Sequence, residues 1–154
     1  MDSDSFTQLV LGIVHEAEKL KDSRTGEEHA PVNYACVFAQ SDEEFEDAMA
    51  AAKNMGRIVK ETPTGPLFLI PSLNTLAGPL RLIKIRKPDP SRPERGDADF
   101  TVSDFGAFKK KHVGTEGFSL IVRENMELVE LKDSQSNVRA YFSRPALIEL
   151  LGIR

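Results

Sequence analysis

The stretch Arg81-Leu82-Ile83-Lys84-Ile85-Arg86 alternates charged and apolar side chains, and Glu127-Leu128-Val129-Glu130-Leu131-Lys132 repeats that alternation position by position. A period of two is typical of a β-strand with one buried face. Each stretch also follows a glycine-led apolar segment, at residues 65–70 and 117–122. The match predicts a duplicated strand arrangement in which Lys84 and Glu130 are counterparts.

Upstream of the first stretch, residues 32–40 alternate bulky and small side chains, which predicts a strand with two buried faces. Ser41 and Glu44 form a capping box, so we expect a helix over residues 42–55. Three short strands between turn-forming residues are expected next, at 57–61, 67–70 and 80–87. The predicted order of the first half is β-α-β-β-β.

The second half begins after residues 88–95, a proline-rich connection that cannot continue a sheet ladder. A strand over 98–102 and a short helix capped by Ser103 are expected after it. Three further strands are expected at 117–122, 126–132 and 138–142. Because only a loop separates the short helix from Gly117, we interpret this half as an abbreviated copy.

Helices are predicted at both ends of the chain. Residues 5–21 carry apolar side chains at helical spacing behind a capping box of Ser5 and Gln8, and residues 144–151 form a final helix. We interpret residues 1–28 as an amphipathic appendage whose stripe either covers the sheet or pairs with a second copy in a homodimer. The modules then span 29–90 and 91–154, in an α+β fold.

The composition of the 154-residue chain is that of a soluble globular protein, with 40% hydrophobic and 29% charged residues. No apolar run approaches the ~20 residues of a membrane-spanning helix, and the acidic start differs from a signal peptide. We therefore expect a cytoplasmic protein without a membrane partner. The single cysteine, Cys36, stands in an apolar run and is interpreted as a small buried hydrophobe.

The net charge of −4 argues against a nucleic-acid-binding protein. Basic residues nevertheless concentrate in residues 81–95, where they favour either a local anion site or a solvated strand and loop. A basic ribbon for nucleic acid is a less favoured interpretation. The basic residues of this segment are Arg81, Lys84, Arg86, Lys87, Arg92 and Arg95.

Two motifs resemble those of the vicinal oxygen chelate superfamily, which includes glyoxalase I, extradiol dioxygenases and fosfomycin-resistance enzymes. Residues 97–104, Asp-Ala-Asp-Phe-Thr-Val-Ser-Asp, are similar to the opening strand of that family's module. Val129-Glu130-Leu131 is similar to its late-strand motif, whose glutamate binds a metal. The resemblance implies two βαβββ-like modules that curl a mixed sheet around a shared cavity, where a divalent metal polarises substrate oxygens.

The metal ligands implied by the resemblance depart from the family's pattern. Asp97 occupies the place of the family's usual histidine, and the first half offers Asn33 or Tyr34 there. Asp97 and Glu130 are thus the candidate metal ligands, and an oxygen-only site favours Mg²⁺ or Mn²⁺ over zinc. The three histidines, His15, His29 and His112, are poor substitutes.

We therefore expect a small-molecule binding or enzymatic protein with a glyoxalase-like fold, acting on an anionic or oxygen-rich ligand. The residues leave catalysis itself open, since neither a phosphate-binding loop nor a nucleophile elbow is present. An ion pair between Lys84 and Glu130, or a non-catalytic dimeric module with a side-chain-filled cavity, are the alternatives. The candidate ligand-binding residues are Asn33, Lys84, Arg86, Asp97 and Glu130.

Overall fold

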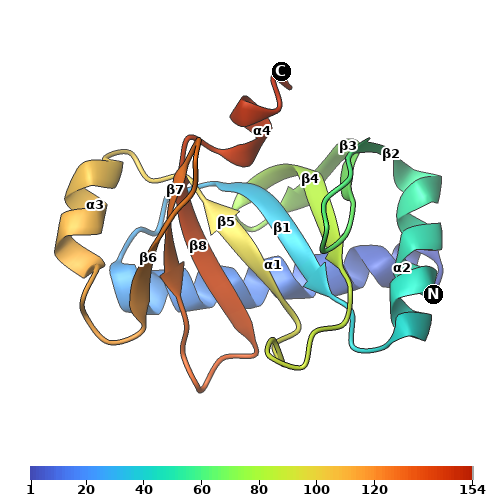
Figure 1. Ribbon diagram of the computed structural model, residues 1–154, viewed down its shortest axis with the longest axis horizontal. Helices are drawn as coiled ribbons and strands as arrows, with labels where there is room; N and C mark the ends of the chain where they lie inside the picture. Colours follow the sequence, from blue (N-terminus) through green and yellow to red (C-terminus); the bar gives the residue numbers. More distant parts are fainter. Residues whose placement is uncertain (154) are drawn as a thin grey trace.

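The computed structural model describes residues 1–153 as four helices and one eight-stranded mixed sheet (Figure 1). The helices are α1 (Ser3–Thr25), α2 (Asp42–Met55), α3 (Phe105–His112) and α4 (Leu147–Leu150). The strands are β1 (Val32–Phe38), β2 (Arg57–Lys60), β3 (Leu67–Thr75), β4 (Gly78–Arg86), β5 (Gly96–Phe100), β6 (Phe118–Val122), β7 (Glu127–Leu131) and β8 (Val138–Arg144). The α+β class is confirmed.

The strand order across the sheet is β2-β3-β4-β1-β5-β8-β7-β6, and the sheet is open at both edges. The central strands β1 and β5 run antiparallel to each other. On one side β1 is parallel to β4, and on the other side β5 is parallel to β8. Antiparallel hairpins complete both wings, with β3 and β2 beyond β4 and with β7 and β6 beyond β8.

The expectation of an abbreviated second half is wrong, because three strands follow α3 just as three follow α2. The prediction that Lys84 and Glu130 occupy equivalent positions in the two halves is also wrong. Lys84 lies on β4, which adjoins the central strand β1, whereas Glu130 lies on β7, which β8 separates from β5. Strands with alternating charged and apolar residues resemble one another in sequence. The match therefore aligned two strands that hold different positions in the sheet.

Helix α1 crosses behind the sheet and supplies one wall of the core (Figure 1). Its apolar stripe is buried against the sheet and α2, so residues 1–28 are an integral part of the fold and the term appendage is wrong. The stripe is not free to pair with a second copy. Its buried apolar members are Phe6, Val10, Ile13, Val14, Ala17 and Leu20.

The close approach of α1 to the sheet depends on a glycine at the start of β5. A Cβ atom on Gly96 would lie 2.3 Å from the Cys36 carbonyl oxygen and 2.8 Å from Ile13 Cδ1. Both distances are shorter than real Cβ contacts, and one partner is backbone that cannot move alone. Gly96 therefore lets β5 and α1 pack at this spacing.

The helix starts follow local side-chain capping, which sequence predicted for one helix of three. Ser41 caps α2 as expected, and its side chain accepts a hydrogen bond from the Glu44 backbone N–H at 3.1 Å. Asp2 caps α1 in place of the expected Ser5, and Asp104 caps α3 in place of Ser103. The final helix α4 is shorter than residues 144–151 and begins beyond Pro145. No helix in residues 1–153 has both the length and the apolar character that crossing a bilayer requires.

Replacing Ser41 with alanine is expected to lower the free energy of unfolding by about 1 kcal/mol, the usual cost of losing a side-chain N-cap. Urea unfolding followed by circular dichroism measures this loss. Ser41→Asp keeps an acceptor at the same position and should retain wild-type stability. Equal destabilisation by both substitutions would show that the cap bond is not the cause.

Candidate functional site

The face of the sheet opposite α1, called the open face below, carries charged and polar side chains. On β5, Ala98 and Phe100 belong to the helix-covered core, so the alternate residues Asp97 and Asp99 point to the open face. Helix α4 lies at the end of the sheet where β1 begins, and the connection 87–95 lies where β1 ends (Figure 1). The open face lies between these two borders.

Strand register places one row of open-face residues across the centre of the sheet. Cys36 pairs with Lys84 on β4 and with Asp97 on β5. Asp97 in turn pairs with Arg139 on β8. The row therefore reads Lys84, Cys36, Asp97 and Arg139 across four adjacent strands, with a lysine at one end and an arginine at the other.

The arginine end of the row is an ion-pair network, in which Glu94 Oε1 is buried without a hydrogen-bond partner. Arg139 Nε lies 3.0 Å from Glu94 Oε2, and Arg139 Nη1 lies 3.3 Å from Glu130 Oε2. The Tyr141 hydroxyl donates a 2.6 Å hydrogen bond to the same Glu130 oxygen. The side chains of Arg139, Glu94 and Glu130 are 6%, 15% and 12% exposed, so this end is filled by paired side chains.

Burial and pairing act in opposite directions on the charged groups of this network. Burial raises the pKa of Glu94, but hydrogen bonding and attraction to Arg139 outweigh that effect, so its pKa lies below the usual range. Burial also lowers the pKa of Arg139, and its bonds to Glu94 and Tyr141 more than reverse the shift. The ionised forms of both groups are therefore stabilised in the folded chain.

The lysine end of the row has an excess of positive charge. Lys84 Nζ donates a 2.5 Å hydrogen bond to Thr64 Oγ1, and no carboxylate of residues 1–153 lies within ion-pair distance of it. Arg86 Nη2 lies 3.4 Å from Asp89 Oδ2, and its buried Nε has no hydrogen-bond partner. Asp89 is thus the partner of one of the cations at this end.

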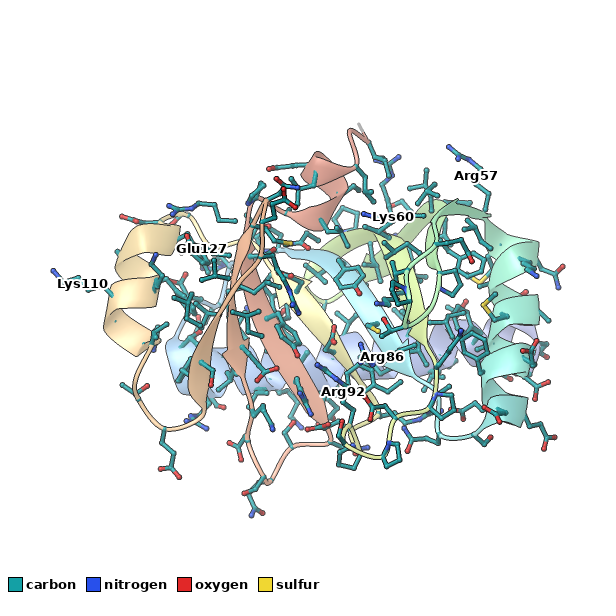
Figure 2. The ribbon with its side chains drawn as sticks, viewed as in Figure 1. Arg57, Lys60, Arg86, Arg92, Lys110 and Glu127 are labelled. Carbon is teal, nitrogen blue, oxygen red and sulfur yellow. The ribbon has the colours of Figure 1, made fainter. Side chains whose placement is uncertain are left out.

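Arg92 adds a further cation to the same end of the open face. Its guanidinium carbon lies 5.7 Å from the centroid of the Phe38 ring, and its Nη1 donates a 3.3 Å hydrogen bond to the Tyr141 hydroxyl. Arg86 pairs with Phe38 in the β1–β4 register. Arg86 and Arg92 are therefore neighbours, and Figure 2 shows them close together at the end of β1.

Two buried carboxyl groups lie on β5, across β1 from Lys84 and Arg86. Burial raises the pKa of Asp97 to about 8 and that of Asp99 to about 7. Asp99 accepts hydrogen bonds from Ser143 Oγ at 2.9 Å and Asn33 Nδ2 at 3.4 Å, whereas Asp97 Oδ1 is buried with no partner. At neutral pH Asp97 is largely protonated, so it does not neutralise Lys84, Arg86 and Arg92.

No family model and no curated protein matches the sequence. A solved structure described as a structural-genomics protein, EC4020, is similar with a TM-score of 0.72 at 11% sequence identity. The match covers 97% of this chain and 91% of that one. At this identity the similarity establishes the fold alone.

The structure places four of the five expected ligand-binding residues on the open face: Lys84, Arg86, Asp97 and Glu130. Lys84, Arg86 and Asp97 lie together, whereas Glu130 belongs to the Arg139 network at the other end. The expected ion pair between Lys84 and Glu130 is therefore wrong. Asn33 lies beside Asp99 and donates a 2.9 Å hydrogen bond to Thr101 Oγ1.

The arrangement of Asp97 and Glu130 does not fit a shared metal ion. They lie on β5 and β7, and β8 runs between them with Arg139 and Tyr141 on the same face. Glu130 already accepts from both of those side chains. Within residues 1–153 no three His, Cys, Asp or Glu side chains gather in a metal-binding geometry. We derive no step through a metal here.

Sequence reasoning missed the residues that decide the charge of the open face. Arg92 was counted as part of a basic segment, but nothing in the proline-rich connection indicates that it turns back over Phe38. Arg139 and Tyr141 do carry a signal, because they alternate with the core residues Ala140 and Phe142. That alternation places both on the face shared with Asp97 once the neighbouring strand is known.

The basic segment 81–95 does not form a continuous ribbon. Arg95 makes a two-pronged contact with Glu44, at 2.7 Å from each carboxylate oxygen, and Arg86 contacts Asp89. A cavity of about 280 Å³ lies beside this segment at the border of the open face. Its lining is Ala39, Gln40, Pro88, Asp89, Pro90, Arg92 and Pro93.

Proposed function

We propose that this protein binds a small organic anion on the open face of its sheet, at Lys84, Arg86 and Arg92. The observation that carries the proposal is the unbalanced positive charge there: three cations face one paired carboxylate, Asp89, and a protonated one, Asp97. An anion would supply the missing negative charge in a partly buried setting, where the attraction is stronger than in water.

Partial burial of these three cations lowers the stability of the fold unless a ligand supplies hydrogen-bond acceptors for them. Lys84 Nζ has Thr64 as its hydrogen-bond acceptor, and Arg86 Nε is buried without one. Buried polar groups are normally satisfied, and an unsatisfied one costs about 1–3 kcal/mol. A carboxylate or phosphate presents several acceptor oxygens, and protonated Asp97 adds a donor to the same site.

The same topology supports a relation of fold to the vicinal oxygen chelate superfamily. We infer that residues 29–90 and 91–154 are two βαβββ-like modules related by an approximate twofold axis between β1 and β5. The support is the strand order. From β1 outward the strands are β4, β3 and β2, and from β5 outward they are β8, β7 and β6, with a parallel pair first on both sides. The proposed ligand site lies on the face that both modules share.

The test is an amide chemical-shift titration of the protein with inorganic phosphate and, separately, with succinate. Saturable shifts confined to β1, β4 and the connection 87–95 are expected. Lys84→Met should weaken binding about tenfold, equivalent to about 1.4 kcal/mol. Lys110→Met on the exposed helix α3 is the matched control and should bind as the wild type does (Figure 2).

The proposal fails if neither anion produces saturable shifts on the open face. It also fails if Lys84→Met and Lys110→Met bind with the same affinity as the wild type. A homodimer is a separate expectation of the sequence, and its interface would have to lie outside the buried stripe of α1. Sedimentation equilibrium at several protein concentrations tests that expectation.

A further inference from the structure

We propose that the ligand of the open face is an oxo acid whose carbonyl carbon forms an imine with Lys84 Nζ. This inference rests on the proposed anion site and names the chemical class of its ligand. The geometry points to it because Lys84 is the amine at the site, with Arg86 two residues along β4 and the unpartnered Asp97 carboxyl group across β1 in the same row.

Lys84 occupies a position in which its amine is held but not neutralised by a carboxylate. It lies half-buried on β4, between Leu67 of β3 and Cys36 of β1 in the strand register. Both neighbours are buried, at 2% exposure each, and Thr64 holds the amine by one hydrogen bond. An amine bound this way retains a lone pair for attack once it has lost its proton.

Lys21 shows how the chain compensates the charge of a fully buried lysine. Lys21 is fully buried, and its Nζ donates to Glu18 at 2.8 Å, to Asp22 at 2.9 Å and to the Glu27 carbonyl oxygen at 2.6 Å. Three acceptors fit the three donors of an ammonium group, so Lys21 is a structural cation. Lys84 lacks such a set, and it is half-buried where Lys21 is fully buried.

The surroundings of Lys84 raise the neutral fraction of an amine whose protonated form is a cation of the anion site. Burial lowers the pKa of Lys84 first, and Arg86 of β4 and Arg92 of the connection lower it further. Cys36 of β1 and Asp97 of β5 act in the opposite direction. Desolvation beside other cations is the usual way in which a lysine becomes a nucleophile at neutral pH.

The condensation balances with groups that are present. The lone pair of Nζ attacks the carbonyl carbon, a C–N bond forms, and the C=O π electrons and an amine proton yield a carbinolamine. Protonated Asp97 then gives its proton to the carbinolamine oxygen, which leaves as water while the nitrogen lone pair forms the iminium. Asp97 remains as a carboxylate beside that cation, and Arg86 and Arg92 hold the substrate's carboxylate.

Trapping with borohydride tests the inference, because hydride reduces an imine to a stable secondary amine. The protein is incubated with limiting pyruvate and sodium cyanoborohydride, and intact mass and peptide mapping locate the adduct. One reduced pyruvate on Lys84 is expected, in clear excess over any exposed lysine, since a lowered pKa gives a larger neutral fraction of the amine. Lys84→Arg should lose this adduct, and Lys110→Arg should keep it.

Succinate, which has no carbonyl group to condense, separates this inference from the proposed function. It should compete with pyruvate and suppress the adduct on the wild-type protein. If succinate binds the open face but pyruvate labels all lysines equally, the imine is wrong and the anion site stands. If neither succinate nor phosphate binds the open face, both proposals are overturned. A thermal unfolding curve for Lys84→Arg excludes misfolding as the reason for a lost adduct.

Discussion

Arg139→Met is expected to destabilise the fold by about 3 kcal/mol, the cost of breaking a buried ion pair from one side. The substitution keeps much of the side-chain volume but leaves Glu94 and Glu130 without their shared cation. Both carboxylates are largely buried, so water replaces the lost partner poorly. For a chain of this length the melting temperature should fall by about 6–12 °C.

A second substitution isolates the reason for that loss. In the Arg139→Met background, Glu130→Gln removes one stranded carboxylate and still accepts the hydrogen bond from the Tyr141 hydroxyl. The double variant should recover at least about 1 kcal/mol relative to Arg139→Met, as measured by urea unfolding. If the double variant is less stable than the single one, the network is not held by charge pairing.

The second large effect expected is a gain in stability at alkaline pH on replacing Asp97 with asparagine. Burial raises the pKa of Asp97 to about 8, far above its ordinary value of 3.8. The folded chain therefore holds a proton that the unfolded chain releases, and its stability falls as pH rises from about 4 through 8. Asparagine cannot ionise, so the variant should not lose the stability that ionisation of Asp97 costs the wild type.

Melting temperatures at about pH 4 and about pH 9 measure this effect. Asp97→Asn should be close to the wild type at the lower pH and at least about 5 °C more stable at the higher one, with 2–4 °C expected per kcal/mol. The Asp99 carboxyl, with a pKa raised to about 7, still titrates in the variant. Asp47→Asn on the exposed surface of α2 is the control, and an equal gain there would refute the assignment to burial.

On the open face Lys84 of β4 and the protonated Asp97 of β5 lie in one row, with Cys36 of β1 between them. The two ends of the row differ in how their positive charge is compensated. Arg139 forms ion pairs with carboxylates of the chain, whereas Lys84 has a hydroxyl group as its hydrogen-bond partner. Uncompensated cations lower the free energy of unfolding of the free protein, and an anion that binds the folded state raises it. The protein should therefore gain thermal stability with the anions that it binds.

Element positions were largely predictable because they depend on local patterns. The alternation in residues 80–87 and 138–142 placed β4 and β8 to within a few residues, and Ser41 identified the start of α2. The strand expected at 67–70 is too short, because β3 continues through Pro71 and Asn74 to Thr75. Proline is tolerated there at an irregular part of the ladder.

The sequence by itself determined that Lys84 and Arg86 lie on a strand with one charged face, since alternation is a local property of each strand, whereas the strand expected at 98–102 stopped short of Asp97. Tertiary structure alone decided that β4, β1, β5 and β8 are adjacent, that Arg139 takes Glu94 and Glu130 as partners, and that Arg92 turns back over Phe38. Strand neighbours and burial arise from contacts between distant residues. Those contacts set the charge balance of the open face, which a periodic pattern does not contain.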